Sequence, residues 1–143
     1  RQGLRELGRA YRDWARQRPA AFYIIFGDPI PGYQAPATEV MAPAARTLQG
    51  LIVVLGAAHQ AGDLCLPLEP PASPVLAVSL KAWSDAVHRT HPDILYLAFM
   101  IASRVQGLML VELGRQLPPF IDDCTGLYER ETERMILEIA GNH

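Results

Sequence analysis

Hydrophobic residues recur along most of the chain at the spacing of α-helices, and no segment alternates with the spacing of a β-strand. The first segment shows the pattern clearly. Its apolar positions fall three or four residues apart, at Leu4, Leu7, Tyr11 and Trp14. Arginines occupy the opposite side, at Arg1, Arg5, Arg9, Arg12 and Arg16. We therefore expect an amphipathic helix whose basic face is either solvated or close to a basic neighbouring domain.

Prolines, glycines and capping residues divide the chain into further helices. Pro19 interrupts the first helix and can open a short second one that ends at Phe26, before a loop rich in proline and glycine. A long helix is expected from Thr38 or Pro43 to Ala61, with Gly62 as its stop. The other predicted helices run from Ser73-Pro74 to about Arg89, from Pro92 to about Arg115, and from Asp122 or Asp123 to Gly141. Five substantial helices and a short one make the predicted fold all-α.

The last two predicted helices carry more apolar surface than a small bundle can cover. Between Ile94 and Val111 apolar residues lie on nearly every side of the helix, so it has to be covered all round. Small residues along one edge would let another helix approach closely. We expect these two helices to pair with an identical copy into a four-helix interface. The predicted interface residues are Ser103, Gly107, Val111, Gly114, Leu127, Tyr128, Met135 and Ile139.

Aromatic and sulfur-containing side chains lie on helices that must share one core. They either fill that core or line a cavity for an apolar or amphipathic small molecule. Arg104 is the notable polar candidate, because it lies between apolar residues in mid-helix, where a buried arginine needs a partner. Glu112 is beyond its reach on the same helix, so Arg104 either extends to solvent or meets a ligand. The candidate ligand-binding residues are Trp14, Phe22, Phe26, Met41, Leu48, Ile52, Trp83, Val87, Tyr96, Met100 and Arg104.

Composition narrows the possible functions. The 143 residues fit a single domain, and the net charge of −2 argues against nucleic-acid binding by the whole chain. No catalytic motif, metal-ligand spacing or cofactor fingerprint is present, and we expect neither a metal nor a cofactor. Cys65 and Cys124 follow no pattern, which fits a reduced cytosolic protein and leaves one structural disulfide open as the alternative. The longest apolar run ends before Arg104, so we expect no membrane span.

Two segments carry a family resemblance. The first is Tyr11-Arg-Asp-Trp14-Ala15-Arg-Gln-Arg18-Pro19, followed by Tyr23-Ile-Ile-Phe26-Gly27 and a loop that reaches Tyr33. The second is Arg104-Val-Gln-Gly107-Leu108 with Glu112-Leu113-Gly114. Together they resemble the C-terminal ligand-binding and dimerisation domain of TetR-type bacterial transcriptional repressors, in the subgroup with a Trp-x-x-x-His-Gly signature. Ala102 and Gln106 stand where that subgroup has Trp and His.

The resemblance implies one regulatory domain over residues 1–143, folded as an orthogonal bundle of five to six helices. It implies a homodimer in the bacterial cytoplasm that binds a small effector in its core and reaches operator DNA only through an N-terminal helix-turn-helix domain. That domain is not in this chain, which begins at Arg1 and is expected to be a fragment. Two other interpretations stay open. The chain is either a dimerisation module with a filled core, or a small helical enzyme that uses Arg104, Glu112 and a histidine.

Overall fold

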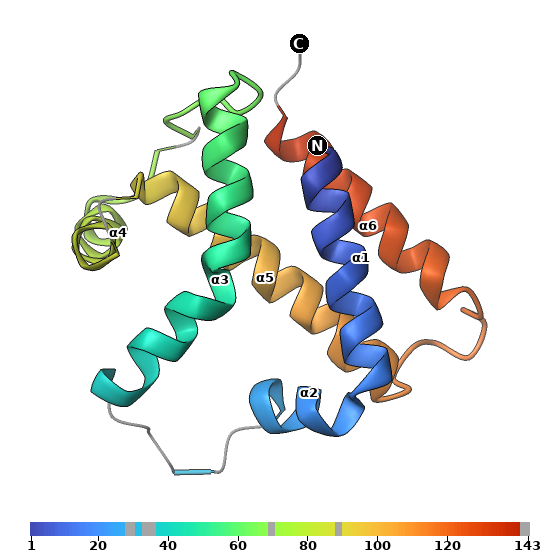
Figure 1. The fold of residues 1–143 in the computed structure, drawn as a ribbon. Helices are drawn as coiled ribbons and strands as arrows, with labels where there is room; N and C mark the ends of the chain where they lie inside the picture. The colour runs from blue at the N-terminus through green and yellow to red at the C-terminus, as the bar shows by residue number, and fades with distance from the viewer. Residues whose placement is uncertain (28–30, 33–36, 69–70, 88–89, 141–143) are drawn as a thin grey trace.

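The computed structural model describes residues 1–27, 31–32, 37–68, 71–87 and 90–140, without the side chains of 37–45. Within these residues the chain forms six helices and no strand, which confirms the all-α prediction (Figure 1). Their bounds are α1 Gln2–Gln17, α2 Pro19–Phe26, α3 Ala37–Gln60, α4 Pro74–Ala86, α5 Pro92–Leu113 and α6 Cys124–Ile139. The predicted boundaries lie within a few residues of these.

Local chemistry at the helix ends explains this agreement. The backbone N–H of Leu76 donates to the Ser73 hydroxyl, and that of Gly126 donates to the Asp123 carboxylate at 2.8 Å. Proline occupies the first turn of α2, α4 and α5, where its missing N–H costs nothing. Gly62 has a φ of +81° and closes α3 through a hydrogen bond from its N–H to the His59 carbonyl. These signals act over a few residues and can be read from sequence.

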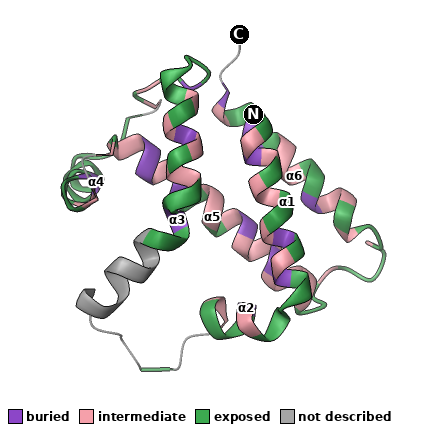
Figure 2. Ribbon diagram, viewed as in Figure 1, coloured by how far each residue is buried: buried purple, intermediate pink, exposed green. Residues whose placement is uncertain are grey.

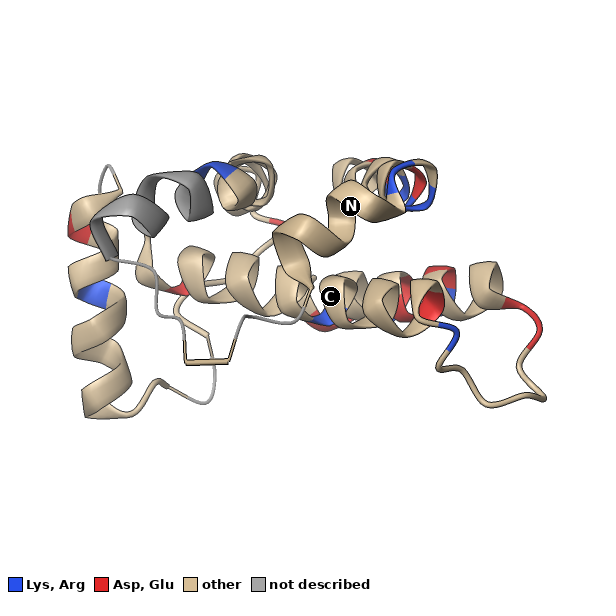
Figure 3. Cartoon of the chain, turned by 90° about the horizontal axis from the view of Figure 1, so that it is seen from below, with Lys and Arg blue, Asp and Glu red and all other residues tan. Residues whose placement is uncertain are grey.

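The helices form two layers. Figure 3 shows α1 and α3 in one layer and α5 and α6 in the other, with α4 across one end. The helix α5 is central, because it packs against α1, α3, α4 and α6. Figure 2 shows buried residues as short purple bands along α1, α3, α5 and α6, the helices of both layers. The functional interior therefore lies between the α1–α3 layer and α5 with α6.

The buried residues separate into two clusters rather than one continuous core. One cluster contains Leu4, Leu55, Leu64, Ile94, Ala98 and Ile136. The other contains Ala15, Phe22, Val105, Met109, Tyr128 and Met135. Ile101 of α5 packs against both clusters. In the region between the two clusters, the side chains of the two helical layers do not fill the space completely.

The helix α5 is the one described helix whose length and composition would let it cross a membrane. Core helices of soluble proteins meet the same criterion, so this is weak support for a span. Only 28% of its most apolar stretch is buried within the chain. Phe99 is 53% exposed and Met100 38% exposed on this helix. The apolar excess expected from the sequence is therefore present on the folded chain.

Candidate functional site

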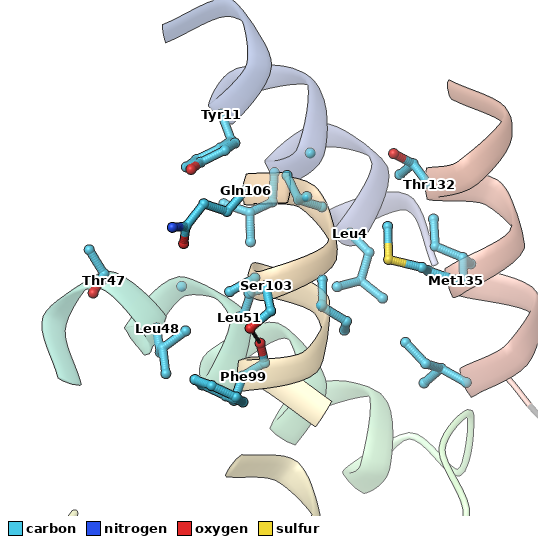
Figure 4. A pocket seen from close by; sticks show the side chains of 18 of the residues that line it. Leu4, Tyr11, Thr47, Leu48, Leu51, Phe99, Ser103, Gln106, Thr132 and Met135 are labelled. Carbon is cyan, nitrogen blue, oxygen red and sulfur yellow. Dashed lines mark hydrogen bonds between the residues drawn. The ribbon is translucent and has the colours of Figure 1, made fainter. Parts of the chain in front are cut away.

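A cavity of about 320 Å³ lies between the two core clusters, and we call it the central cavity. Small-molecule sites typically begin at about this volume. Its lining comes from α1, α3, α5 and α6, with Phe26 at the end of α2 (Figure 4). The lining residues are Leu4, Leu7, Gly8, Tyr11, Phe26, Thr47, Leu48, Gly50, Leu51, Phe99, Ile101, Ala102, Ser103, Val105, Gln106, Thr132, Met135, Ile136 and Ile139.

The lining is apolar except for five side chains, and none of the described lining residues is an acid, a lysine, an arginine or a histidine. Two of the five polar groups are occupied by their own helices. The Ser103 hydroxyl donates to the Phe99 carbonyl at 2.8 Å, and the Thr132 hydroxyl donates to the Tyr128 carbonyl at 2.9 Å. The remaining polar lining residues are Tyr11 and Gln106, together with Thr47, which has a partner of its own. Such a surface can bind an apolar molecule and fix it through few polar contacts.

Tyr11 belongs to an aromatic cluster with Trp14, Phe22 and Phe26 at the junction of α1 and α2. The ring centroids of Tyr11 and Phe26 are 6.2 Å apart and those of Phe22 and Phe26 are 5.3 Å apart. Only Tyr11 and Phe26 of this cluster line the central cavity. Phe22 is fully buried beneath them. The cluster therefore forms one end wall of the cavity and fixes the angle between α1 and α2.

Burial raises the pKa of the Tyr11 phenol to about 12, because removal from water disfavours the phenolate. Between pH 10 and 12 the unfolded chain therefore releases a proton that the folded chain keeps. We expect the free energy of unfolding to fall as pH rises through this window, and Tyr11→Phe to reduce that fall. Urea midpoints between about pH 8 and pH 11 measure it. An equal pH dependence in wild type and variant would contradict this assignment.

On the arginine face of α1, Arg1, Arg9 and Arg16 are exposed, as expected of a solvated surface, whereas Arg5 and Arg12 pack against acidic residues. Arg5 donates to Glu133 at 2.6 and 2.8 Å, and Arg9 lies 4.0 Å from Glu129. Hydrogen bonding to Arg5 lowers the pKa of Glu133. The sequence shows each charge, but not that α6 brings glutamates to this side of α1.

Arg12 is the buried member of this face, with 7% of its surface exposed. Its guanidinium donates to both carboxylate oxygens of Glu112, at 3.0 and 2.8 Å, and to the Thr125 hydroxyl at 3.1 Å. Hydrogen bonding and the charge of Glu112 raise the Arg12 pKa, although burial, the largest single influence, opposes the charged form. The pair connects α1 to α5, and Thr125 connects α1 to the start of α6.

Arg104 lies outside the lining of the central cavity. It forms a salt bridge with Glu131 and donates to Glu138 at 2.7 Å, so it connects α5 with α6 on a partly exposed side. Hydrogen bonds to these glutamates raise the pKa of Arg104. The structure thus gives Arg104 protein partners from another helix, and pairs Glu112 with Arg12 instead.

The other predicted ligand-binding residues are divided by the structure. Phe26 and Leu48 line the central cavity. Ile52 packs against the first core cluster, and Trp83 packs edge-on against Phe99, with ring centroids 6.4 Å apart. The described positions outside the lining are Trp14, Phe22, Ile52, Trp83, Val87, Tyr96 and Met100. The side chain of Met41 lies outside the described residues.

The predicted interface residues are also divided. Ser103, Met135 and Ile139 line the central cavity. Tyr128 is 3% exposed and donates to the Gly8 carbonyl at 2.8 Å, so it packs within the chain. A Cβ placed on Gly107 would meet no atom within 4 Å, whereas one on Gly114 would meet the Leu110 carbonyl oxygen at 2.7 Å. Val111 and Leu127 are half-buried.

Several lining residues were not singled out as a site from the sequence. Leu4, Leu7 and Tyr11 were visible as the apolar stripe of α1, but a stripe does not distinguish packing from lining. Ala102 and Gln106 carried a better signal. They are the two positions at which the chain departs from the Trp and His of the resembled signature, and both line the central cavity.

Comparison with known proteins agrees with this architecture. The family model described as "Tetracyclin repressor-like, C-terminal domain" matches residues 4–135. The HTH-type transcriptional regulators Rv1816 of Mycobacterium tuberculosis and Mb1846 of Mycobacterium bovis are each 22% identical to the chain over 138 residues. The match covers 96% of this chain and 58% of each relative. Because the family match runs from the first turn of α1 to the later turns of α6, the chain belongs to the tetracyclin repressor-like C-terminal domain family.

Proposed function

We propose that this chain is the effector-sensing and dimerisation domain of a bacterial, cytoplasmic TetR-type transcriptional regulator with no enzymatic role. The observation that carries the proposal is the central cavity, because it separates the two core clusters and has an apolar lining. A dimerisation module with a filled core has no need of such a space. The chain spans 58% of the length of its relatives, and we assign operator binding to a helix-turn-helix domain outside it.

The arrangement of α1 supports a signalling role for the cavity. One face of α1 lines the cavity through Leu4, Leu7 and Tyr11, while its arginine face is held to α5 and α6. A molecule that enters between the layers therefore contacts α1 and α3 at once. A ligand that binds one arrangement of these helices more tightly than another shifts the population toward it. Such a shift would change the placement of a DNA-binding domain joined to α1.

Filling the cavity with protein should abolish this binding. We expect Nile red, an uncharged apolar dye, to bind wild type with a fluorescence increase and a rise in Tm. Ala102→Leu places a branched side chain in the lining, so it should remove both responses while the protein remains folded. Ala57→Leu makes the same change on the exposed side of α3 and should leave them intact. Equal binding by wild type and Ala102→Leu would contradict the assignment.

A second copy of the chain is the partner that we assign to α5 and α6. The apolar stretch of α5 is only 28% buried, and Gly107 on the same helix leaves open space where another helix can approach. A stable interface needs about 800 Å² from each partner. Met100 of α5 and Leu137 of α6 are exposed apolar side chains that such an interface would cover.

This assignment predicts a mass of about twice 15.8 kDa by light scattering at micromolar concentration. Gly107→Leu should shift the protein toward the monomer, because the added side chain occupies the space that a partner helix needs. Gly56 of α3 is also a mid-helix glycine with no atom near its Cβ position, so Gly56→Leu is the matched control and should remain dimeric. A monomeric wild type, or an unaffected Gly107→Leu, would count against the dimer.

A further inference from the structure

The polar groups of the central cavity restrict what it can bind, and this inference rests on the function proposed above. None of the described lining residues carries a formal charge at neutral pH. The cavity is open to solvent beside the exposed Thr47, Gly50 and Phe99, and an ionised head group taken inside that rim loses its hydration and gains no opposite charge from the described lining. An uncharged ligand loses less on entry, provided its polar atoms find hydrogen-bond partners.

Three arginines on the lining helices are engaged elsewhere. Arg5 and Arg12 of α1 bond to Glu133 and Glu112, and Arg104 of α5 bonds to Glu131 and Glu138. Each cation is therefore neutralised by a partner from another helix. Arg46 of α3 is exposed and is not part of the lining. Among the described residues these charges are paired outside the cavity, and the polar groups that line it are neutral.

Gln106 is the polar side chain best placed to meet a ligand. It lines the cavity from the middle of α5, and its carboxamide makes no hydrogen bond to another described residue. Figure 4 shows its amide pointing to the same side as the Tyr11 hydroxyl, toward the part of α3 that carries Thr47. A carboxamide donates and accepts at once, whereas Tyr11 keeps its proton and can donate. Together they match a neutral group with both kinds of atom.

We propose that the central cavity selects an uncharged, mainly apolar ligand with one amide, alcohol or carbonyl group, and that Gln106 is the residue that recognises this group. Ligands with the same apolar chain but a carboxylate or ammonium head group bind more weakly. The specificity follows from the placement of one neutral carboxamide in a lining whose described residues carry no charge. This role also accounts for the glutamine at position 106, where the resembled signature has a histidine.

The test uses four ligands with the same eight-carbon chain, namely octanamide, octan-1-ol, octanoate and octylamine, in competition with Nile red at neutral pH. We expect octanamide and octan-1-ol to displace the dye at concentrations at least about tenfold lower than the two ions. Gln106→Leu should weaken octanamide by about five- to tenfold, with each displacement corrected for the affinity of the same variant for Nile red. Gln49→Leu, the same change at an exposed position on α3, should alter neither.

A second variant in the same competition experiment introduces a positive charge at Gln106. Gln106→Lys should reverse the preference toward octanoate, because the lysine supplies the opposite charge that the lining lacks. If wild type prefers octanoate or octylamine, or if Gln106→Leu binds octanamide as wild type does, the inference is overturned. If Nile red and all four compounds fail to bind wild type, the proposed sensing function itself fails. The two failures are therefore distinguishable.

Discussion

Replacing Phe22 with alanine is expected to lower the free energy of unfolding by about 4 kcal/mol, the largest effect we expect from any single change in this chain. Phe22 is fully buried and contacts Tyr11, Trp14 and Phe26, with ring centroids 5.3 to 6.3 Å away. Its removal leaves a space that the neighbouring helices α1 and α2 cannot close without changing their angle. Thermal and urea denaturation measure the loss, which corresponds to a fall in Tm of roughly 10 °C or more.

Two residues of the same helix serve as controls. Ile24 is 85% exposed, so Ile24→Ala should change the free energy of unfolding by less than about 0.5 kcal/mol. Phe26 lines the central cavity and is half-buried, so Phe26→Ala should weaken Nile red binding more than it weakens the fold. Similar stability losses for Phe22→Ala and Ile24→Ala would show that α2 is not packed as described.

Arg12→Ala is expected to destabilise the chain by about 3 kcal/mol, because it leaves the carboxylate of Glu112 with 14% of its side chain exposed and without its main partner. The remaining contact of Glu112, with Arg16 at 3.7 Å, is longer and more exposed. Arg9→Ala is the matched control on the same helix. Its pair with Glu129 spans 4.0 Å with both side chains more than half exposed, so the loss should be below about 1 kcal/mol.

The double variant Arg12→Met, Glu112→Leu separates the cost of an unpaired charge from the value of the pair. Replacing both buried partners with apolar side chains of similar size removes the uncompensated carboxylate, and should recover most of the stability lost in Arg12→Ala. Denaturant midpoints for the four proteins provide the comparison. If Arg12→Ala and Arg9→Ala have the same effect, Arg12 is not the buried connection between α1 and α5.

The sequence does not predict which apolar side chains line the central cavity and which fill the core. Phe22 and Phe26 lie four residues apart on one short helix and were equal candidates for ligand binding. The structure buries Phe22 beneath the aromatic cluster and leaves Phe26 at the cavity wall. Whether an apolar side chain fills the core or lines a cavity depends on how far the facing helices stop from it. No periodicity within α2 contains that information.

Helix existence, helix ends and family membership were determined by the sequence itself, because capping groups, prolines and apolar stripes act over a few neighbouring residues. Tertiary structure alone decided which residues line the cavity and which charges are paired. Arg12 and Glu112 are 100 residues apart in the chain, and nothing local to either predicts their contact. The partners of Arg104 and of Arg5 on α1 are likewise not predictable from local sequence. They lie on other helices, which come together only when the chain folds.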